Sequence, residues 1–129
     1  MANCVFCQIA NNKLPAHIIY QESNMVAFLD NNPKETGHTL IVPKQHFSNL
    51  LEIPADLLAS TIKVTQKVTK IINQSLKPDG LNIYQNNGSI AGQAIDHFHF
   101  HIVPRYQKEP PIDKENLQAI AKILKRNAE

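Results

Sequence analysis

Three histidines alternate with apolar residues in the stretch DHFHFHIVPR, residues 96–105. Successive side chains of a β-strand point to opposite faces, so His97, His99 and His101 are predicted to share one face. A single histidine on a strand is usually structural and satisfied by a backbone partner. Three in register would each need partners at two ring nitrogens, which favours a functional site.

Two kinds of chemistry fit such a row. One is a catalytic zinc site with an open position for water. Residues 97 and 101 would lie ~13 Å apart along an extended strand, however, so three ligands do not easily converge on one ion. The other is covalent catalysis, because a histidine with a pKa of ~6.5 is mostly uncharged at neutral pH and can attack phosphorus. The spacing favours His99 as the nucleophile and His101 as a donor to a phosphate oxygen or to the leaving group.

A glycine-containing loop precedes the histidines and spans residues 88–93. Backbone N–H groups bind phosphate oxygens well where glycine lets the phosphate approach closely, as Gly88 and Gly92 would allow. We expect this loop to lie against the phosphate.

Cys4 and Cys7 form a Cys-x-x-Cys pair, and the chain has no other cysteine. With His46 and His97 they make a Cys2His2 set that suits a closed tetrahedral zinc site. A redox pair is disfavoured, because such a pair usually opens a helix after a strand and no strand can precede residue 4. Two ordinary buried thiols remain an alternative. Four protein ligands leave no position for water, so a zinc here is predicted to be structural and to lie ~7 Å from His99 by strand spacing.

The elements that position these residues follow from the apolar periodicity. Strands joined by short turns around one long amphipathic helix predict an α+β fold with an antiparallel five-stranded sheet, in a single domain over residues 1–129. The long helix is expected to cover one face of the sheet. The predicted strands are 17–21, 25–29, 38–43, 81–86 and 95–103, and the predicted helices are 3–11, 54–76 and about 113–127.

Composition narrows the classes of partner. The chain has 13 Lys+Arg against 11 Asp+Glu, a net charge of +2, and such a near balance argues against a nucleic-acid surface. No apolar run approaches the ~20 residues that a membrane span needs. The N-terminal stretch lacks the basic and apolar regions of a signal peptide, so a cytoplasmic protein is expected.

The stretch HFHFHIV resembles the pattern of the histidine triad (HIT) family, His-φ-His-φ-His-φ-φ, in which φ is apolar. The likeness runs in order through CVFCQIA, IIYQESNMVAFLD, GHTLIVPKQH and GLNIYQNNGSIAGQAIDHFHFHIVPR, and so covers residues 4–106. It implies the HIT fold, a homodimer, and hydrolysis or transfer of purine nucleoside monophosphate derivatives, such as those of AMP, through a nucleotidyl-histidine intermediate.

The resemblance also implies a role for individual side chains. It makes His99 the nucleophile and His101 its helper at the phosphate and leaving group, and it gives zinc to the Cys2His2 set. The remaining positions that it implies are His38 as a fourth histidine, Gln93 and Gly92 at the phosphate loop, Asp30 on the ribose hydroxyls, Phe6, Ile9 and Phe28 around the base, and Asn86 beside phosphate and sugar.

The chain departs from the family pattern at two places that bear on which leaving group is preferred. Ala94 stands where many nucleoside phosphoramidases carry a serine that meets the substrate phosphate, and Pro110–Pro111 with a helix replace a short aromatic ending. A nucleoside phosphoramidate is the expected substrate type. A dinucleoside polyphosphate hydrolase, a nucleotide-binding regulatory module and a zinc hydrolase built on the triad are the alternatives.

Overall fold

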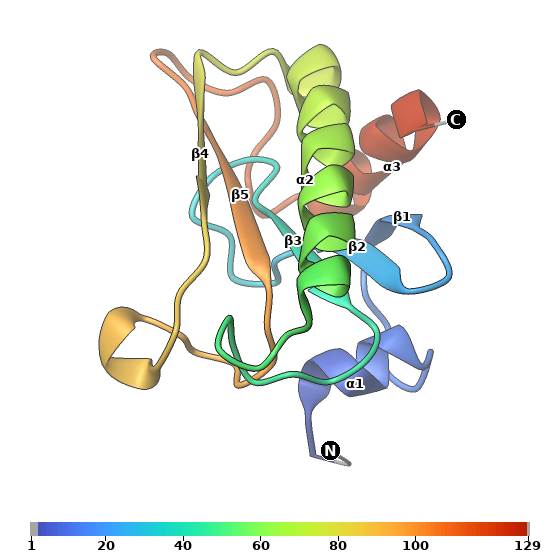
Figure 1. Cartoon of the computed structure of the whole chain (residues 1–129). Helices are drawn as coiled ribbons and strands as arrows, with labels where there is room; N and C mark the ends of the chain where they lie inside the picture. The colour runs from blue at the N-terminus through green and yellow to red at the C-terminus, as the bar shows by residue number, and fades with distance from the viewer. Residues whose placement is uncertain (1–2, 129) are drawn as a thin grey trace.

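The computed structural model describes residues 3–128 as a five-stranded antiparallel sheet with helices against both faces (Figure 1). The α+β class and the five-stranded antiparallel sheet are thereby confirmed. The single domain predicted over 1–129 also takes in residues 1, 2 and 129, which lie outside the described range. The elements are α1 (Val5–Ala10), β1 (Ile18–Gln21), β2 (Met25–Leu29), β3 (Thr39–Pro43), α2 (Ala55–Leu76), β4 (Gly80–Tyr84), η1 (Ser89–Ala91), β5 (Phe100–Arg105) and α3 (Leu117–Ala128).

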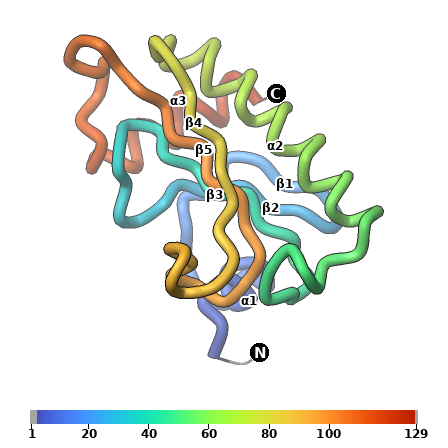
Figure 2. Tube along the Cα trace, turned by 60° about the vertical axis from the view of Figure 1, so that its left-hand side comes forward, coloured from blue at the N-terminus to red at the C-terminus, as the bar shows by residue number. Residues whose placement is uncertain are grey.

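The strand order β1-β2-β3-β5-β4 places the last strand of the chain inside the sheet. β5 pairs with β3 on one side and with β4 on the other, so β4 forms an edge. The trace in Figure 2 shows that α1 and the η1 turn lie at the same end of the sheet. Segments distant in sequence therefore meet beside the start of β5.

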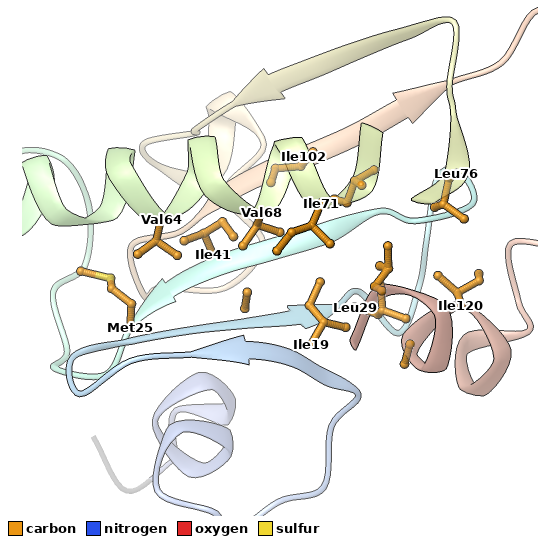
Figure 3. Close-up of a cluster of buried hydrophobic side chains, with 14 residues drawn as sticks. Ile19, Met25, Leu29, Ile41, Val64, Val68, Ile71, Leu76, Ile102 and Ile120 are labelled. Atoms are coloured by element: carbon orange, nitrogen blue, oxygen red, sulfur yellow. The ribbon is translucent and has the colours of Figure 1, made fainter. Parts of the chain in front are cut away.

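One face of the sheet is covered by α2 and α3. The apolar side of α2 sends Val64 and Val68 onto Ile41 of β3 and Ile102 of β5 (Figure 3). These side chains are at most 3% exposed, and each is worth about 1.5–3 kcal/mol of burial. The helix was predicted to cover one face, and it does. No helix within residues 3–128 is both long and apolar enough to cross a membrane.

The opposite face carries α1 and a second, smaller apolar cluster. Phe6 and Ile9 of α1 pack over Phe28 of β2 and Leu40 of β3. Because both faces of these two strands are covered, every residue of β2 and β3 is buried. This packing holds the N-terminal helix close to the histidines.

Two boundaries differ from the prediction. β5 begins at Phe100 and not at residue 95, because the backbone N–H of Phe98 donates to the carbonyl of Phe47 at 2.6 Å and leaves the strand ladder. Only His101 of the three alternating histidines therefore lies in a strand. α3 begins at Leu117 and not near 113, because the side chain of Asn116 accepts from the N–H of Ala119 at 3.3 Å and caps the helix. The other predicted elements agree within two residues, and the loop at 87–93 contains η1.

Gly37 lies at a position where a larger residue should destabilise the fold. Its φ of +89° suits glycine, and a Cβ there would lie 2.6 Å from Cδ1 of Leu76 and 3.3 Å from Cγ of Pro104. We expect Gly37→Ala to lower the free energy of unfolding by about 2–3 kcal/mol in a denaturant titration. Gly80→Ala is the matched control, because no atom lies within 4 Å of its Cβ position. Equal losses in the two variants would contradict the role of Gly37.

Candidate active site

A cavity of about 390 Å³ opens between α1, the loop after β2 and the start of β5. One end is apolar and the other carries histidines, a carboxylate, a lysine and an amide. Its lining includes Phe6, Ile9, Phe28, Leu40 and Ile95 at the apolar end, and Asp30, Lys34, His38, Asn86, His99 and His101 at the polar end.

The ring of His99 is buried and its tautomer is fixed by the backbone. Nδ1 lies 2.7 Å from the carbonyl oxygen of His97, which can only accept, so Nδ1 carries the proton. The ring is 5% exposed and meets the edge of Phe6 at 5.1 Å between centroids. Burial lowers the pKa of His99, although the His97 carbonyl and Asp30 oppose this shift. The imidazole is therefore neutral at pH 7, with a lone pair on Nε2.

A chain of hydrogen bonds sets the tautomers of His38 and His101 in the same way. The backbone N–H of Lys34 donates to Nδ1 of His38 at 3.1 Å, so a neutral His38 carries its proton on Nε2. This Nε2 lies 3.0 Å from Nδ1 of His101, which must accept. His101 consequently holds its proton on Nε2. Burial, with repulsion from His99, His38 and Lys34, lowers the pKa of His101 to about 3. His101 is a neutral hydrogen-bond donor at neutral pH.

The sheet and one tight turn place these two histidines. Gly37 directs the chain into β3, and the N–H of Asp30 donates to the carbonyl of His38 at 3.0 Å, which closes the loop between β2 and β3. In the sheet register, His101 lies between Leu40 of β3 and Tyr84 of β4. The Tyr84 ring stacks on His101 with centroids 4.6 Å apart. His101 is thus held from two sides.

Asp30, Asn86 and Gly92 line the cavity beside the histidines. The Asp30 carboxylate accepts from the N–H of Asn32 at 2.9 Å and lies 3.5 Å from Nε2 of His38. Asn86 donates to the carbonyl of Gly92 at 3.3 Å. A Cβ on Gly92, whose φ is +95°, would lie 3.3 Å from the Asn86 amide, so glycine allows this close approach. These groups offer oxygens to hydroxyl groups and an amide to a phosphate.

The structure does not bring the Gln93 side chain into the cavity. Its oxygen accepts from the N–H of Gly88 at 2.8 Å, and its nitrogen donates to the carbonyls of Ser48 at 2.6 Å and Ile95 at 3.1 Å. Gln93 therefore ties three loop segments together. The other predicted catalytic and nucleotide-binding side chains all line the cavity.

Sequence reasoning missed Lys34 and Tyr84. Lys34 lines the cavity, and its Nζ donates to the Tyr84 hydroxyl at 2.9 Å. The signal for Tyr84 was the pairing of its strand with the histidine strand, which places it opposite His101. Lys34 lies in a turn, where the sequence has no periodicity that would indicate which way its side chain points.

Cys4, Cys7, His46 and His97 come together as predicted and could hold a metal ion, with ligand atoms within 4.8 Å of one another. Tetrahedral zinc with bonds of ~2.3 Å to sulfur and ~2.0–2.1 Å to nitrogen needs sulfur and nitrogen about 3.5 Å apart. Nδ1 of His97 lies 3.3 and 3.6 Å from the two sulfurs, and Nδ1 of His46 lies 3.4 Å from that of Cys7.

The protonation states at this cluster also fit a cation. Nε2 of His97 donates to the carbonyl of Pro43 at 2.8 Å, which leaves the lone pair of Nδ1 directed at the sulfurs. Burial and the neighbouring Cys4 raise the pKa of Cys7 to about 11. The Cys7 thiolate that would bind a metal therefore needs the charge of the ion to form.

Comparison with known proteins confirms the resemblance that the motifs carry. A family model described as the HIT domain matches residues 11–108. An uncharacterised HIT-like protein of Methanocaldococcus jannaschii is 44% identical over 111 residues, which cover 86% of this chain and 85% of that protein. An adenosine 5'-monophosphoramidase of Schizosaccharomyces pombe is 34% identical over 131 residues, covering 95% of this chain and 96% of the relative.

Solved structures match over nearly the whole chain. A hypothetical histidine triad nucleotide-binding protein from Sulfolobus tokodaii superposes with a TM-score of 0.91 at 36% identity, covering 97% of this chain and 91% of that one. A zinc-bound histidine triad family protein from Mycobacterium smegmatis gives a TM-score of 0.87 at 32% identity, covering 98% and 94%.

Proposed function

The chain belongs to the histidine triad (HIT) family, and on this premise we propose that it hydrolyses or transfers purine nucleoside monophosphate groups through a nucleotidyl-histidine intermediate. The observation that carries the proposal is the 2.7 Å bond from Nδ1 of His99 to the His97 carbonyl. It leaves the lone pair of a neutral Nε2 available in a cavity that His99 lines.

The cavity supports a nucleoside monophosphate as substrate. Phe6, Ile9 and Phe28 form an apolar wall that suits the face of a purine, and the Asp30 carboxylate suits the two hydroxyls of a ribose. The S. pombe relative is named an adenosine 5'-monophosphoramidase, which favours an AMP derivative with a phosphorus–nitrogen bond.

The proposed first step forms a bond from Nε2 of His99 to the α-phosphorus. The bond from phosphorus to the leaving atom breaks, its electron pair goes to that atom, and the atom takes a proton from solvent while it accepts a hydrogen bond from the N–H at Nε2 of His101. His101 stays neutral, and the phosphorylated His99 ring, whose centroid lies 4.8 Å from that of His101, carries one positive charge. Donors from the loop of Gly92 and Asn86 would bind the phosphoryl oxygens.

Water completes the cycle. It attacks the phosphorus, one of its protons goes to solvent, and the electron pair of the broken bond returns to Nε2 of His99. A zinc hydrolase built on the triad is less well supported. Among the described residues, two clusters could hold a metal, Cys4–Cys7–His46–His97 and Asp30–His38–His101, and neither contains His99.

We also propose that the Cys4–Cys7–His46–His97 cluster binds one structural zinc. The sulfur–nitrogen distances near 3.5 Å and the zinc-bound M. smegmatis relative support it. When bound, zinc would supply the positive charge that stabilises two thiolates. It would fasten α1, and with it Phe6, to the segment that carries His97 and His99.

A homodimer is proposed on the family resemblance and on exposed apolar side chains of α2 and of the edge strand β4. Ile62 on α2 is 51% exposed and Ile83 on the edge strand β4 is 45% exposed. A second copy that covers α2 and β4 would bury both side chains and pair the edge strand.

Trapping tests the intermediate. The protein is mixed with an adenosine 5'-phosphoramidate labelled in the adenosine and quenched within milliseconds into alkaline denaturant. We expect a nucleotide attached to His99 in the wild-type protein. In His99→Ala the adduct should be absent and kcat should fall about 10³-fold or more, because no other group replaces the nucleophile. His17→Gln, a histidine outside the cavity lining, is the matched control and should keep both. An adduct that survives in His99→Ala would refute the assignment.

Metal removal tests the zinc proposal. We expect about one zinc per chain, lost in Cys7→Ser, and chelation should lower the melting temperature and the affinity for AMP together, because Phe6 lies between the two cysteines. Metal content, thermal unfolding and AMP titration measure the three effects. The proposal fails if a chelator removes no metal, or if removal leaves both stability and affinity unchanged.

A further inference from the structure

Lys34 and Tyr84 form a wall beside the active site that the reaction described above does not use. The Tyr84 ring lies against the His101 ring at 4.6 Å between centroids, with 17° between the planes. Nζ of Lys34 donates to the Tyr84 hydroxyl at 2.9 Å and lies 5.2 Å from the centre of the Tyr84 ring. The ammonium group is therefore held by the ring that covers His101.

Lys34 supplies the one permanent positive charge among the described residues that line the cavity. Its backbone N–H donates to Nδ1 of His38 at 3.1 Å. Burial lowers the pKa of both His38 and His101, and the nearby charge of Lys34 adds to this effect. An ammonium group has three N–H donors, and the bond to Tyr84 uses one. Lys34 can therefore donate to a ligand without leaving Tyr84.

The order of groups around the phosphorus places this wall on the leaving-group side. The attacking and leaving atoms of a phosphoryl transfer lie roughly in line, on opposite sides of the phosphorus. In the proposed reaction His99 attacks from one side, and the N–H of His101 faces the leaving atom on the other. A leaving group that extends past His101 toward the stacked Tyr84 ring would come within reach of the Lys34 ammonium group, which bonds to the Tyr84 hydroxyl.

We propose that Lys34, positioned by Tyr84, selects leaving groups that carry a negative charge, a phosphate or a carboxylate, a few atoms from the bond that breaks. The inference rests on the proposed function and adds the class of leaving group. A lysine ammonium binds such anions as a point charge. The wall would disfavour cationic leaving groups by like-charge repulsion.

A matched series of substrates tests the inference. Adenosine 5'-phosphoramidates of ethanolamine, β-alanine and O-phosphoethanolamine share the phosphorus–nitrogen bond and a two-carbon linker, and they end in a hydroxyl, a carboxylate and a phosphate. We expect the wild-type protein to have a higher kcat/KM for an anionic member than for the ethanolamine member. Lys34→Gln should lower that preference about fivefold to tenfold, the effect of one partly solvated charge.

Two further measurements separate charge from structure. Tyr84→Phe keeps the stacked ring but removes the hydroxyl that holds Lys34, so it should lower the same preference about twofold. Raising the salt concentration to about 0.5 M should weaken the preference in the wild type, because screening acts on an exposed charge. Lys63→Gln, an exposed lysine on α2 outside the cavity lining, is the matched control and should preserve the preference.

The outcomes distinguish this inference from the proposed function. If Lys34→Gln lowers the preference over the ethanolamine substrate only for the phosphate member, or only for the carboxylate member, the inference is supported and the preferred anion is identified. If Lys34→Gln lowers kcat/KM equally for all three substrates, or if the wild type has no preference for an anionic member, the inference is wrong and the proposed function stands. If the wild type turns over none of the three, both fail.

Discussion

The hydrogen bond from Nδ1 of His99 to the carbonyl of His97 is the contact on which the site depends. Without it, a neutral imidazole divides between two tautomers, and in one of them Nε2, on the cavity side, carries a proton and has no free lone pair. The bond is 2.7 Å long and buried, so water does not compete for the carbonyl. Burial lowers the pKa of His99 and so disfavours the cationic form, and the carbonyl selects the tautomer with the proton on Nδ1.

His97 connects this bond to the Cys4–Cys7–His46–His97 cluster, which could hold a metal ion. Its carbonyl orients His99, its Nε2 is held by the carbonyl of Pro43, and its Nδ1 points at the sulfurs of Cys4 and Cys7. Phe6, between the cysteines, touches the rings of both His97 and His99. His97 thus belongs to both groups of residues, and a disturbance of the N-terminal helix would reach His99 through His97 and through Phe6.

The sequence predicted the sheet, the long helix and most cavity-lining residues, because apolar periodicity and the spacing of histidines and cysteines are local signals. It failed where a tertiary contact decides. Phe98 bonds to Phe47 and withdraws His97 and His99 from the strand, which alternation alone could not indicate. The place of the Gln93 side chain also depends on tertiary contacts, because it donates to the carbonyls of Ser48 and Ile95, which only the folded chain brings near, and its role at the phosphate loop stays a prediction. The direction of the Lys34 side chain depends likewise on its bond to the hydroxyl of Tyr84, which is fifty positions away in sequence.

The tautomer of His99 at neutral pH is the most direct test of this account. Nitrogen-15 NMR of labelled protein, with the His99 signals assigned by their loss in His99→Gln, distinguishes a protonated from an unprotonated ring nitrogen. The account predicts a protonated Nδ1 and an unprotonated Nε2 at pH 7. A proton on Nε2, or a cationic ring with both nitrogens protonated, would contradict it.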